Sequence, residues 1–319
     1  DNGIDDDQNG YIDDIHGWDF VGNYTINNPV FQPDNDPKAS DPANFHGTHT
    51  AGLASATTDN SKGIAGTGFN CKIIPIKVGA DTSAIGGILA GYDGILYAAN
   101  LGADIISCSW GGPGYSPAEE DIINTALAKG SLVVAASGNQ ARSLDESPSY
   151  PAAFKNVLTV GSSLGSTLSS FSNYGILTDV YAPGGNIMSS VPDNKYRMES
   201  GTSMATPIVA GVAALVKSVH PDWSPSQIAK QIRITCDRII AKNEAQAPYL
   251  YGFVNAFKAL QYNNIDTTLL LPGIALLNAI KLNSPSITDY SLNDIRATFT
   301  NYLSPAEGVQ ITLIPEDSW

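Results

Sequence analysis

The sequence predicts an α/β fold in three layers, with a mostly parallel central sheet and helices on both of its faces. Two observations predict it. Between residues 73 and 236, short apolar runs alternate with longer segments of helical periodicity, an order typical of right-handed crossovers and a parallel sheet. The chain has 319 residues, of which 43% are hydrophobic and only 15% charged, so a sizeable buried core is expected.

The expected elements follow in chain order. Residues 1–45 are polar and rich in Asp and Asn, so loops are expected there. Short apolar runs predict strands at 73–78, 105–109, 132–136 and 157–160. Apolar residues at helical spacing, with Pro or Ser at the start and Gly at the end, predict helices at 85–99, 117–129, 204–219 and 224–236. The third of these helices is hydrophobic on most faces and therefore belongs in the core.

After about residue 260 the pattern changes. Four β segments are expected there, at 267–271, 274–282, 295–300 and 309–314. We therefore expect one domain over residues 1–260 and the start of a second, β-rich domain over 261–319. The alternative is a C-terminal extension that packs on the first domain.

Charge and composition exclude several classes of protein. The chain has 17 basic and 31 acidic residues, and a net charge of −14 argues against nucleic acid as a partner. The acidic surface either keeps the protein soluble or in part holds cations. No run of 18 apolar residues occurs, so no membrane span is expected. The acidic first residues contain no signal peptide, and an export signal would have to lie upstream.

Three cysteines, Cys71, Cys108 and Cys236, are too few and too irregular for a disulfide framework. We expect them to act as small buried hydrophobic residues, although one pair could bridge.

The segment 201–207, GTSMATP, places Ser203 at the start of the apolar helix. A helix N-terminus offers free N–H groups and the positive end of the helix dipole. A hydroxyl at that point can attack a carbonyl while its own N–H helps to hold the oxyanion. The alternative is that Ser203 or Thr202 only caps the helix.

A serine nucleophile needs a base, which is usually histidine. Of the four histidines, His46 and His49 lie in a segment of Gly and small residues that allows close packing. The pair could also hold a metal at i, i+3 spacing, but no third ligand stands near it in sequence. An oxyanion donor is expected in Asn139, just past the strand at 132–136, unless it is an ordinary turn residue.

Three segments in this order, HGTHTAG at 46–52, AASGN at 135–139 and GTSMATP at 201–207, closely resemble the subtilisin-like serine proteases, or subtilases. Residues 107–112 resemble the strand that lines that family's substrate cleft, and 251–256 resemble its closing element. The resemblance covers about residues 15–260.

This resemblance implies a serine endopeptidase that hydrolyses protein or peptide substrates through an acyl-enzyme. His46 would be the general base, Ser203 the nucleophile and Asn139 the oxyanion donor. The substrate-binding residues would flank the first pocket and pair with the peptide as an added strand: Ser109, Trp110, Gly111, Ala136 and Gly138. A secreted or cell-surface location is expected.

The chain departs from the family in one respect. The family's triad includes an Asp at the end of an apolar strand, before the His, and no stretch here matches it. Residues 17–21 resemble a stretch that follows that Asp, so we expect the N-terminal strand and its Asp to be missing and activity to be about 10⁴-fold lower. The missing strand would leave a sheet edge through which copies could self-associate. Asp19 is the alternative third member.

Residues 5–14, DDDQNGYIDD, match the front half of a D-x-D-x-N-G calcium loop. The predicted ligands are oxygens of Asp5, Asp7, Asn9, Tyr11, Asp13 and Asp14. The usual acid at the twelfth position would fall on His16, so a solvated acidic loop is the alternative. Two other functions stay open for the chain: an inactive protease-like binding module, if the orienting Asp is absent, and a calcium-dependent adhesion module, which rests on the acidic loop and the C-terminal β segments.

Overall fold

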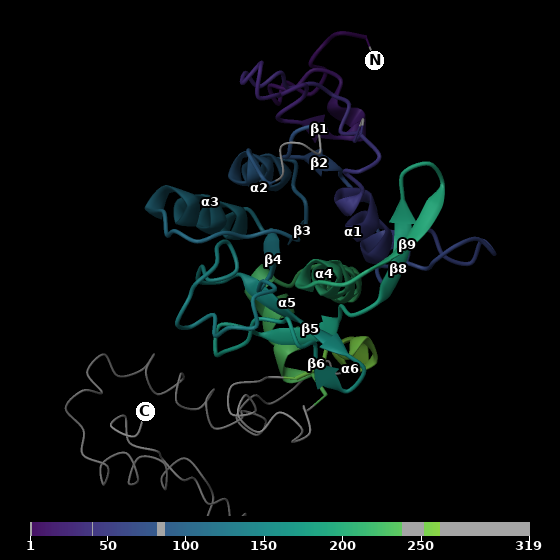
Figure 1. Cartoon of the computed structure of the whole chain (residues 1–319), viewed down its shortest axis with the longest axis vertical. Coiled ribbons are helices and arrows are strands. Elements are labelled where there is room, and N and C mark those ends of the chain that lie inside the picture. Colours follow the sequence, from purple (N-terminus) through teal and green to yellow (C-terminus); the bar gives the residue numbers. More distant parts are fainter. Residues whose placement is uncertain (1, 40, 82–86, 238–251, 262–319) are drawn as a thin grey trace, which may run out of the picture. The chain divides into compact units, whose positions relative to one another are not determined.

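The computed structural model describes residues 2–39, 41–81, 87–237 and 252–261 (Figure 1). The chain divides into two units, Asp1–Asn263 and Asn264–Trp319, and every described residue lies in the first of them. The four β segments expected after residue 260 therefore lie outside the described residues.

The main sheet confirms the predicted α/β fold. Strands β3 (Ile105–Cys108), β4 (Leu132–Ala136), β5 (Leu158–Leu164) and β7 (Val180–Pro183) lie side by side and run parallel, and the short β6 (Thr167–Leu168) is antiparallel to β5. All five residues of β4 are buried, as expected for a strand with neighbours on both edges and layers on both faces.

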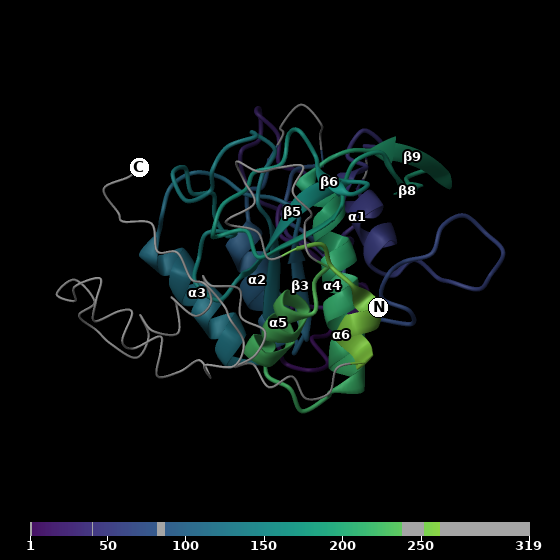
Figure 2. The ribbon, with the colours of Figure 1, turned by 90° about the horizontal axis from the view of Figure 1, so that it is seen from below.

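Helices cover both faces of this sheet (Figure 2). On one face, α2 (Gly91–Asn100) and α3 (Pro117–Ala128) pack on side chains such as Val133. On the other face, α4 (Thr202–Val219), α5 (Pro225–Ile234) and α6 (Ala256–Gln261) pack on side chains such as Val134. Because neighbouring residues of a strand point to opposite faces, β4 contributes to both cores.

Two of the predicted elements differ from the structure. The helix expected at 85–99 is observed only from Gly91, because the N–H groups of Leu89 and Ala90 both bond to the carbonyl of Val78 instead of entering a helix. Residues 85 and 86 lie outside the described part. The strand expected at 73–78 is reduced to β2 (Ile76–Lys77), which pairs in parallel with β1 (Trp18–Asp19).

Strand β2 is short because it has a described neighbour on one edge only. It pairs with β1 in a separate two-stranded sheet, and no described strand joins it to β3. Ile73 and Ile74, expected to be buried, are 45% and 40% exposed. On the outer strand of the main sheet, Ser107 is exposed as well. The helix α2 contacts both β2 and β3 and so connects the two sheets.

The remaining elements lie around the helix α1 (His46–Ser55). A hairpin of β8 (Ile187–Val191) and β9 (Lys195–Glu199), not expected from the sequence, packs on α1. The acidic start of the chain contains one short 3₁₀ helix, η1 (Asp14–His16), and is otherwise loop.

One described helix, α4, is long and apolar enough to cross a membrane by length and composition alone. Of the window that meets this test, 61% is buried inside the protein, as for the core helix of a globular domain. The three cysteines are free, and Cys108 is buried.

Candidate active site

Helices α1 and α4 pack side by side and bring two distant segments together (Figures 1 and 2). A Cβ at Gly211 of α4 would lie 2.7 Å from the nitrogen of Gly68 and 3.0 Å from the carbonyl oxygen of Ala54 in α1. Only glycine permits this approach of backbones. His46 lies at the start of α1 and Ser203 at the start of α4. Each stands eight residues before this contact, counted to Ala54 in α1 and to Gly211 in α4.

Ser203 stands at the second position of α4, and the residue that caps the helix is Gly201 without a side-chain hydrogen bond. The interpretation of Ser203 as a mere helix cap is therefore wrong. Its hydroxyl donates a hydrogen bond to the backbone carbonyl of Ser109 (3.1 Å), and the hydroxyl of Ser109 donates to the carbonyl of Ser203 (2.8 Å). These bonds tie the predicted nucleophile to the end of β3.

The side chain of Asn139 is held in one orientation by Thr202. Its amide oxygen accepts hydrogen bonds from the backbone N–H (2.8 Å) and the hydroxyl (2.9 Å) of Thr202. The amide nitrogen has no partner among the described residues and remains a free donor. A Cβ at Gly201 would lie 3.5 Å from this nitrogen and 3.6 Å from the backbone nitrogen of Ser203. Both nitrogens thus lie within 4 Å of one point beside Gly201, and an oxyanion site needs two such donors close together.

His46 begins α1, and its side chain is accessible to solvent. The pKa of His46 is lowered from the ordinary value of 6.5, because partial burial disfavours the charged imidazole and because His49 lies near it, and the carboxylate of Glu199 opposes this effect. A lowered pKa keeps His46 neutral and able to accept a proton near pH 7. No hydrogen bond between His46 and Ser203 is present in the described part of the chain.

The side chain of His49 is turned to the backbone of β9. It is fully buried, and its Nε2 lies 3.0 Å from the carbonyl oxygen of Arg197, so Nε2 carries the proton. In the residues that the structure describes, no three His, Cys, Asp or Glu side chains are placed to hold a metal ion.

Asp19 is engaged away from His46. It is 2% exposed, and its Oδ1 accepts hydrogen bonds from the N–H groups of Val21 and Gly22. Its Oδ2 forms an ion pair with Lys77 (2.6 Å), which also pairs with Asp81 (3.0 Å). Because both oxygens of Asp19 are occupied, the alternative that it orients His46 has no support. In the described residues, no carboxylate accepts a hydrogen bond from the imidazole of His46.

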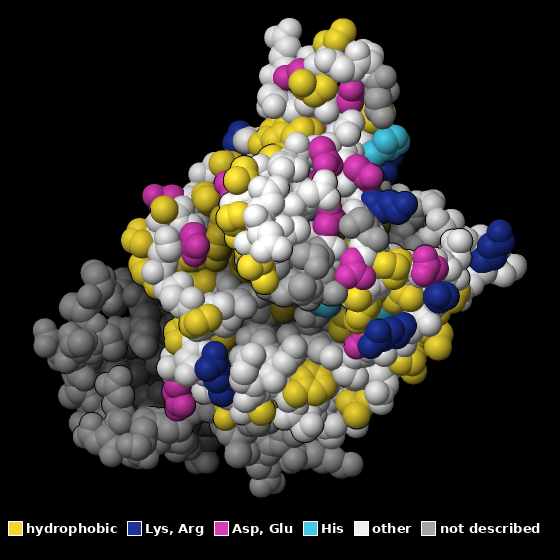
Figure 3. Space-filling model, turned by 45° about the horizontal axis from the view of Figure 1, so that its top comes forward, with side chains coloured by type: hydrophobic (Ala, Val, Ile, Leu, Met, Phe, Trp, Pro, Cys, Tyr) yellow, Lys and Arg dark blue, Asp and Glu magenta, His cyan; other side chains and the backbone are white. Residues whose placement is uncertain are grey.

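The predicted substrate-binding residues extend from the ends of two neighbouring parallel strands. Residues 109–111 follow β3, and Ala136 and Gly138 lie at the end of β4. Trp110 packs edge-to-face on Tyr92 of α2, with ring centres 5.4 Å apart. Gly138 has φ +108° and donates its N–H to the hydroxyl of Thr202 (3.2 Å), so the same threonine positions this strand end as well. Figure 3 shows histidine side chains in a recessed part of the surface near the centre of the view.

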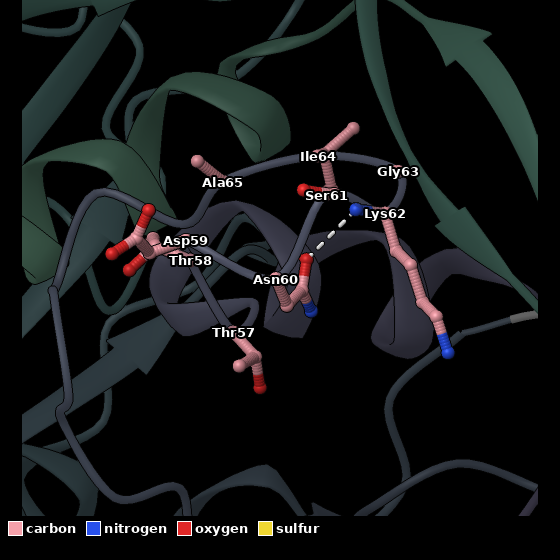
Figure 4. A pocket seen from close by; sticks show the side chains of 9 residues that line it. All are labelled: Thr57, Thr58, Asp59, Asn60, Ser61, Lys62, Gly63, Ile64 and Ala65. Carbon is pink, nitrogen blue, oxygen red and sulfur yellow. Dashed lines mark hydrogen bonds between the residues drawn. The ribbon is translucent and has the colours of Figure 1, made fainter.

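A small pocket lies elsewhere, in the loop after α1 (Figure 4). It is lined by nine consecutive residues, 57–65, and includes none of the predicted catalytic residues. A hydrogen bond from the N–H of Lys62 to the side chain of Asn60 (2.9 Å) closes part of the loop.

The acidic loop brings several predicted calcium ligands around Asn9. The N–H of Asn9 donates to Asp5 (3.1 Å) and Asp7 (3.2 Å), and its side-chain amide donates to Asp7 (3.1 Å) and Asp14 (3.0 Å). Asp13 faces elsewhere and accepts from the N–H groups of Asn2 and Gly3, at 2.8 and 2.7 Å. The ring of Tyr11 packs on Tyr97 of α2, with ring centres 4.6 Å apart.

Two residues in this region were not predicted to have a role, Thr202 and Glu199. Thr202 stands beside the nucleophile, so a hydroxyl next to Ser203 was a signal in the sequence. Glu199 carries no comparable signal, because its position depends on the pairing of β8 with β9.

The chain matches the model of the subtilase family over residues 1–254. It is 43% identical to thermitase from Thermoactinomyces vulgaris over 249 residues, which cover 78% of this chain and 81% of thermitase. It is 40% identical to subtilisin BL from Lederbergia lenta over 223 residues, which cover 69% of this chain and 79% of the relative.

Solved structures agree with these relatives. A protease from Pseudoalteromonas arctica superposes with a TM-score of 0.65 and 31% identity, over 76% of this chain and 82% of that chain. Fervidolysin from Fervidobacterium pennivorans, a keratinolytic enzyme related to subtilisin, superposes with a TM-score of 0.64 and 29% identity, over 74% of this chain and 39% of that chain.

Proposed function

Because the chain belongs to the subtilase family, we propose that it is a serine endopeptidase that cleaves peptide bonds through an acyl-enzyme on Ser203. One observation carries the proposal: the free amide nitrogen of Asn139 and the backbone nitrogen of Ser203 lie close together beside the nucleophile, at the start of α4.

Each residue has one part in the reaction. His46 takes the proton of the Ser203 hydroxyl as this oxygen attacks the substrate carbonyl, and then gives the proton to the leaving amine. Asn139 and the N–H of Ser203 stabilise the oxyanion of the tetrahedral intermediate. Water, activated by His46, then hydrolyses the acyl-enzyme and frees Ser203. Ser109, Trp110, Gly111, Ala136 and Gly138 bind the peptide as an extended strand.

The hydroxyl of Ser203 must turn for this reaction, since it donates to the carbonyl of Ser109. A rotation about χ1 that aims it at His46 is a change between staggered rotamers, which exposed side chains make within nanoseconds.

We further propose that an extended segment outside residues 1–319 fills the space between β2 and β3 and brings the orienting carboxylate. The support is the break between the two parallel sheets, together with the exposure of Ile73, Ile74 and Ser107 along it. A strand at that place would join the sheets into one and would end on the side where 109–111 follow β3.

The acidic loop is proposed to bind calcium. Its ligands are all oxygens, which suit a hard cation. In this structure the carboxylates of Asp5, Asp7 and Asp14 accept hydrogen bonds from Asn9, so binding of the ion would require them to turn toward it. The ligands proposed are Asp5, Asp7, Asn9, Asp14 and the carbonyl of Tyr11. Asp13 is left out because its carboxylate is turned to Asn2 and Gly3. Calcium would serve stability and takes no part in the catalytic steps.

A secreted or cell-surface location is proposed with it, because loops of this kind fill at the millimolar calcium found outside cells.

A protease-like binding module without activity is the second candidate. It is favoured by one observation: no described carboxylate accepts a hydrogen bond from His46, and the Ser203 hydroxyl is bonded to a carbonyl instead.

Labelling with a fluorophosphonate probe decides between the two. The proteins compared are the chain itself, its Ser203→Ala variant as a blank, and a fusion that places the first core strand of thermitase before residue 1. We expect faint labelling of the chain, strong labelling of the fusion and none of the variant. Absence of labelling in both the chain and the fusion, with both folded, would establish the binding module.

A further inference from the structure

Strand β9 runs past the first turn of α1. The carbonyl of Arg197 accepts a hydrogen bond from Nε2 of His49 (3.0 Å). The guanidinium of Arg197 lies 4.2 Å from the centre of the Phe45 ring, and Phe45 is the residue directly before His46. The side of β9 that carries the Arg197 side chain therefore faces the start of α1.

Glu199 lies on that same side of β9, because alternate residues of a strand share a face. The Arg197 guanidinium and the Glu199 carboxylate form an ion pair, with Nε and Oε1 2.5 Å apart. The Glu199 side chain is only 23% exposed. Glu199 ends β9, and four residues later in the chain stands Ser203, at the start of α4.

The hairpin holds this geometry firmly. The hydroxyls of Ser189 and Ser190 donate to the carbonyls of His49 (2.7 Å) and Thr48 (3.3 Å). A Cβ at Gly52 would lie 2.5 Å from both hydroxyl oxygens, so α1 and β8 are in close contact.

Few ionisable groups act on His46. From its own helix, His49 lowers the pKa of His46, in the same direction as burial, which is the largest effect. From β9, the Glu199 carboxylate raises it. Two further charges of β9 lie on this side: Arg197, which is paired with Glu199 and weakens its effect, and Lys195, which is paired with Asp193 in the exposed turn.

We propose that Glu199 is a positioning residue that stabilises His46 in the protonated form that arises during acyl transfer. The inference rests on the proposed function, since in the reaction His46 becomes charged when it takes the proton of Ser203. A carboxylate held in place before the reaction stabilises that charge without having to reorganise. The ion pair to Arg197, and the stacking of Arg197 on Phe45, hold the carboxylate at the start of α1.

A ¹⁵N NMR titration tests this without any need for activity. The chain has only four histidines, and a His46→Gln variant assigns the signal of His46. We expect Glu199→Gln to lower the pKa of His46 and Arg197→Gln to raise it. The matched control is Asp193→Asn, which removes one negative charge from the exposed turn of the same hairpin and leaves the titration of His46 unchanged. Unchanged signals of the other three histidines show that each variant is folded.

An identical titration of His46 in wild type and Glu199→Gln would overturn the inference, and would leave the proposed protease function standing. If Ser203 is never labelled by fluorophosphonate, the proposed function fails and the titration still decides the electrostatic relationship.

A second readout follows the reaction itself. In the labelling-competent protein, Glu199→Gln is expected to slow labelling of Ser203 by a factor of about 2 to 5, the range for a partly exposed charge pair. It is also expected to move the acid limb of the pH profile to lower pH. A rate loss with an unmoved limb would mean a structural role only and would contradict the inference.

Discussion

Thr202 holds both bonds that fix Asn139: its N–H and its hydroxyl donate to the same amide oxygen, at 2.8 and 2.9 Å. Thr202 thereby fixes the orientation of the carboxamide and leaves the amide nitrogen without a partner among the described residues.

Thr202→Val removes both bonds of the hydroxyl, the one to the amide oxygen of Asn139 and the one from the N–H of Gly138, and leaves the backbone bond to Asn139. We expect kcat to fall about fivefold, because the hydroxyl bond to Asn139 contributes about 1 kcal/mol. Thr206→Val is the control, since Thr206 is a buried threonine one turn later whose hydroxyl bonds only to the carbonyl of Thr202. Asn139→Ala is expected to cost about 10²–10³-fold, the loss known for the equivalent donor of subtilisin itself. Adding Thr202→Val to it should cost little more, and additive losses would contradict the coupling.

The approach of α4 to the loop after α1 leaves no room for a side chain at Gly211. Its Cβ would meet two backbone atoms, the Gly68 nitrogen and the Ala54 oxygen, at 3.0 Å or less. We expect Gly211→Ala to lower the free energy of unfolding by about 1–3 kcal/mol, measured by denaturant titration. Gly47→Ala is the control, because nothing lies within 4 Å of its Cβ position in α1. Equal stability of the two variants would show that the helices can separate at no cost.

The pH dependence of activity follows from the lowered pKa of His46. The imidazole must be neutral to accept a proton, and protonation on acidification removes activity. Because its pKa is below the ordinary 6.5, we expect the acid limb of kcat/KM to have its midpoint below pH 6.5. A midpoint above 6.5 would mean that a carboxylate dominates the surroundings of His46 in the active protein.

Calcium is expected to raise the melting temperature. At a concentration 100 times the Kd it would add about 2.7 kcal/mol to the free energy of unfolding, and chelation would remove the gain. Asp7→Asn should abolish the response, and Asp121→Asn, an exposed acid on α3, should leave it intact. A full calcium response in Asp7→Asn would place the site elsewhere.

Asp19 is expected to serve stability alone. Asp19→Asn leaves Lys77 with only Asp81 as partner and should lower the free energy of unfolding by about 3 kcal/mol. The rate of Ser203 labelling per folded molecule should change less than twofold. A loss approaching 10⁴-fold, the cost of removing an orienting Asp, would restore Asp19 to the catalytic group.

The fold was largely predictable from the sequence where local patterns decide it. Strand β4 spans the predicted residues 132–136, and α3 begins at the predicted Pro117, because buried runs and helix caps are local signals. The prediction at 73–78 was mostly wrong for a non-local reason: an apolar run becomes a strand only where a neighbouring strand accepts its hydrogen bonds.

The candidate site likewise combines residues that local motifs predict with residues that only the folded chain brings into place. His46, Asn139 and Ser203 were predicted from motifs, because each stands in a short local pattern. The role of Glu199 could not be predicted, since it follows from a hairpin whose strands are short and have few β-branched residues. Asp19 is the opposite case. The sequence makes it a candidate for the catalytic carboxylate, but in the structure it pairs with Lys77, 58 residues away.

Because no described strand joins β2 to β3, the helix α2 is left to connect the two sheets. With no described backbone ladder between them, the lobe formed by β1 and β2 is joined to the main sheet through side-chain packing, and aromatic rings on α2 meet the acidic loop at one end and Trp110 at the other. Heat or denaturant should therefore loosen this lobe first, and amide hydrogens of β2 should exchange well before those of β4. A ligand that stabilises the packing of this lobe against α2 would also reduce the mobility of Trp110, because Trp110 packs on Tyr92 of the same helix.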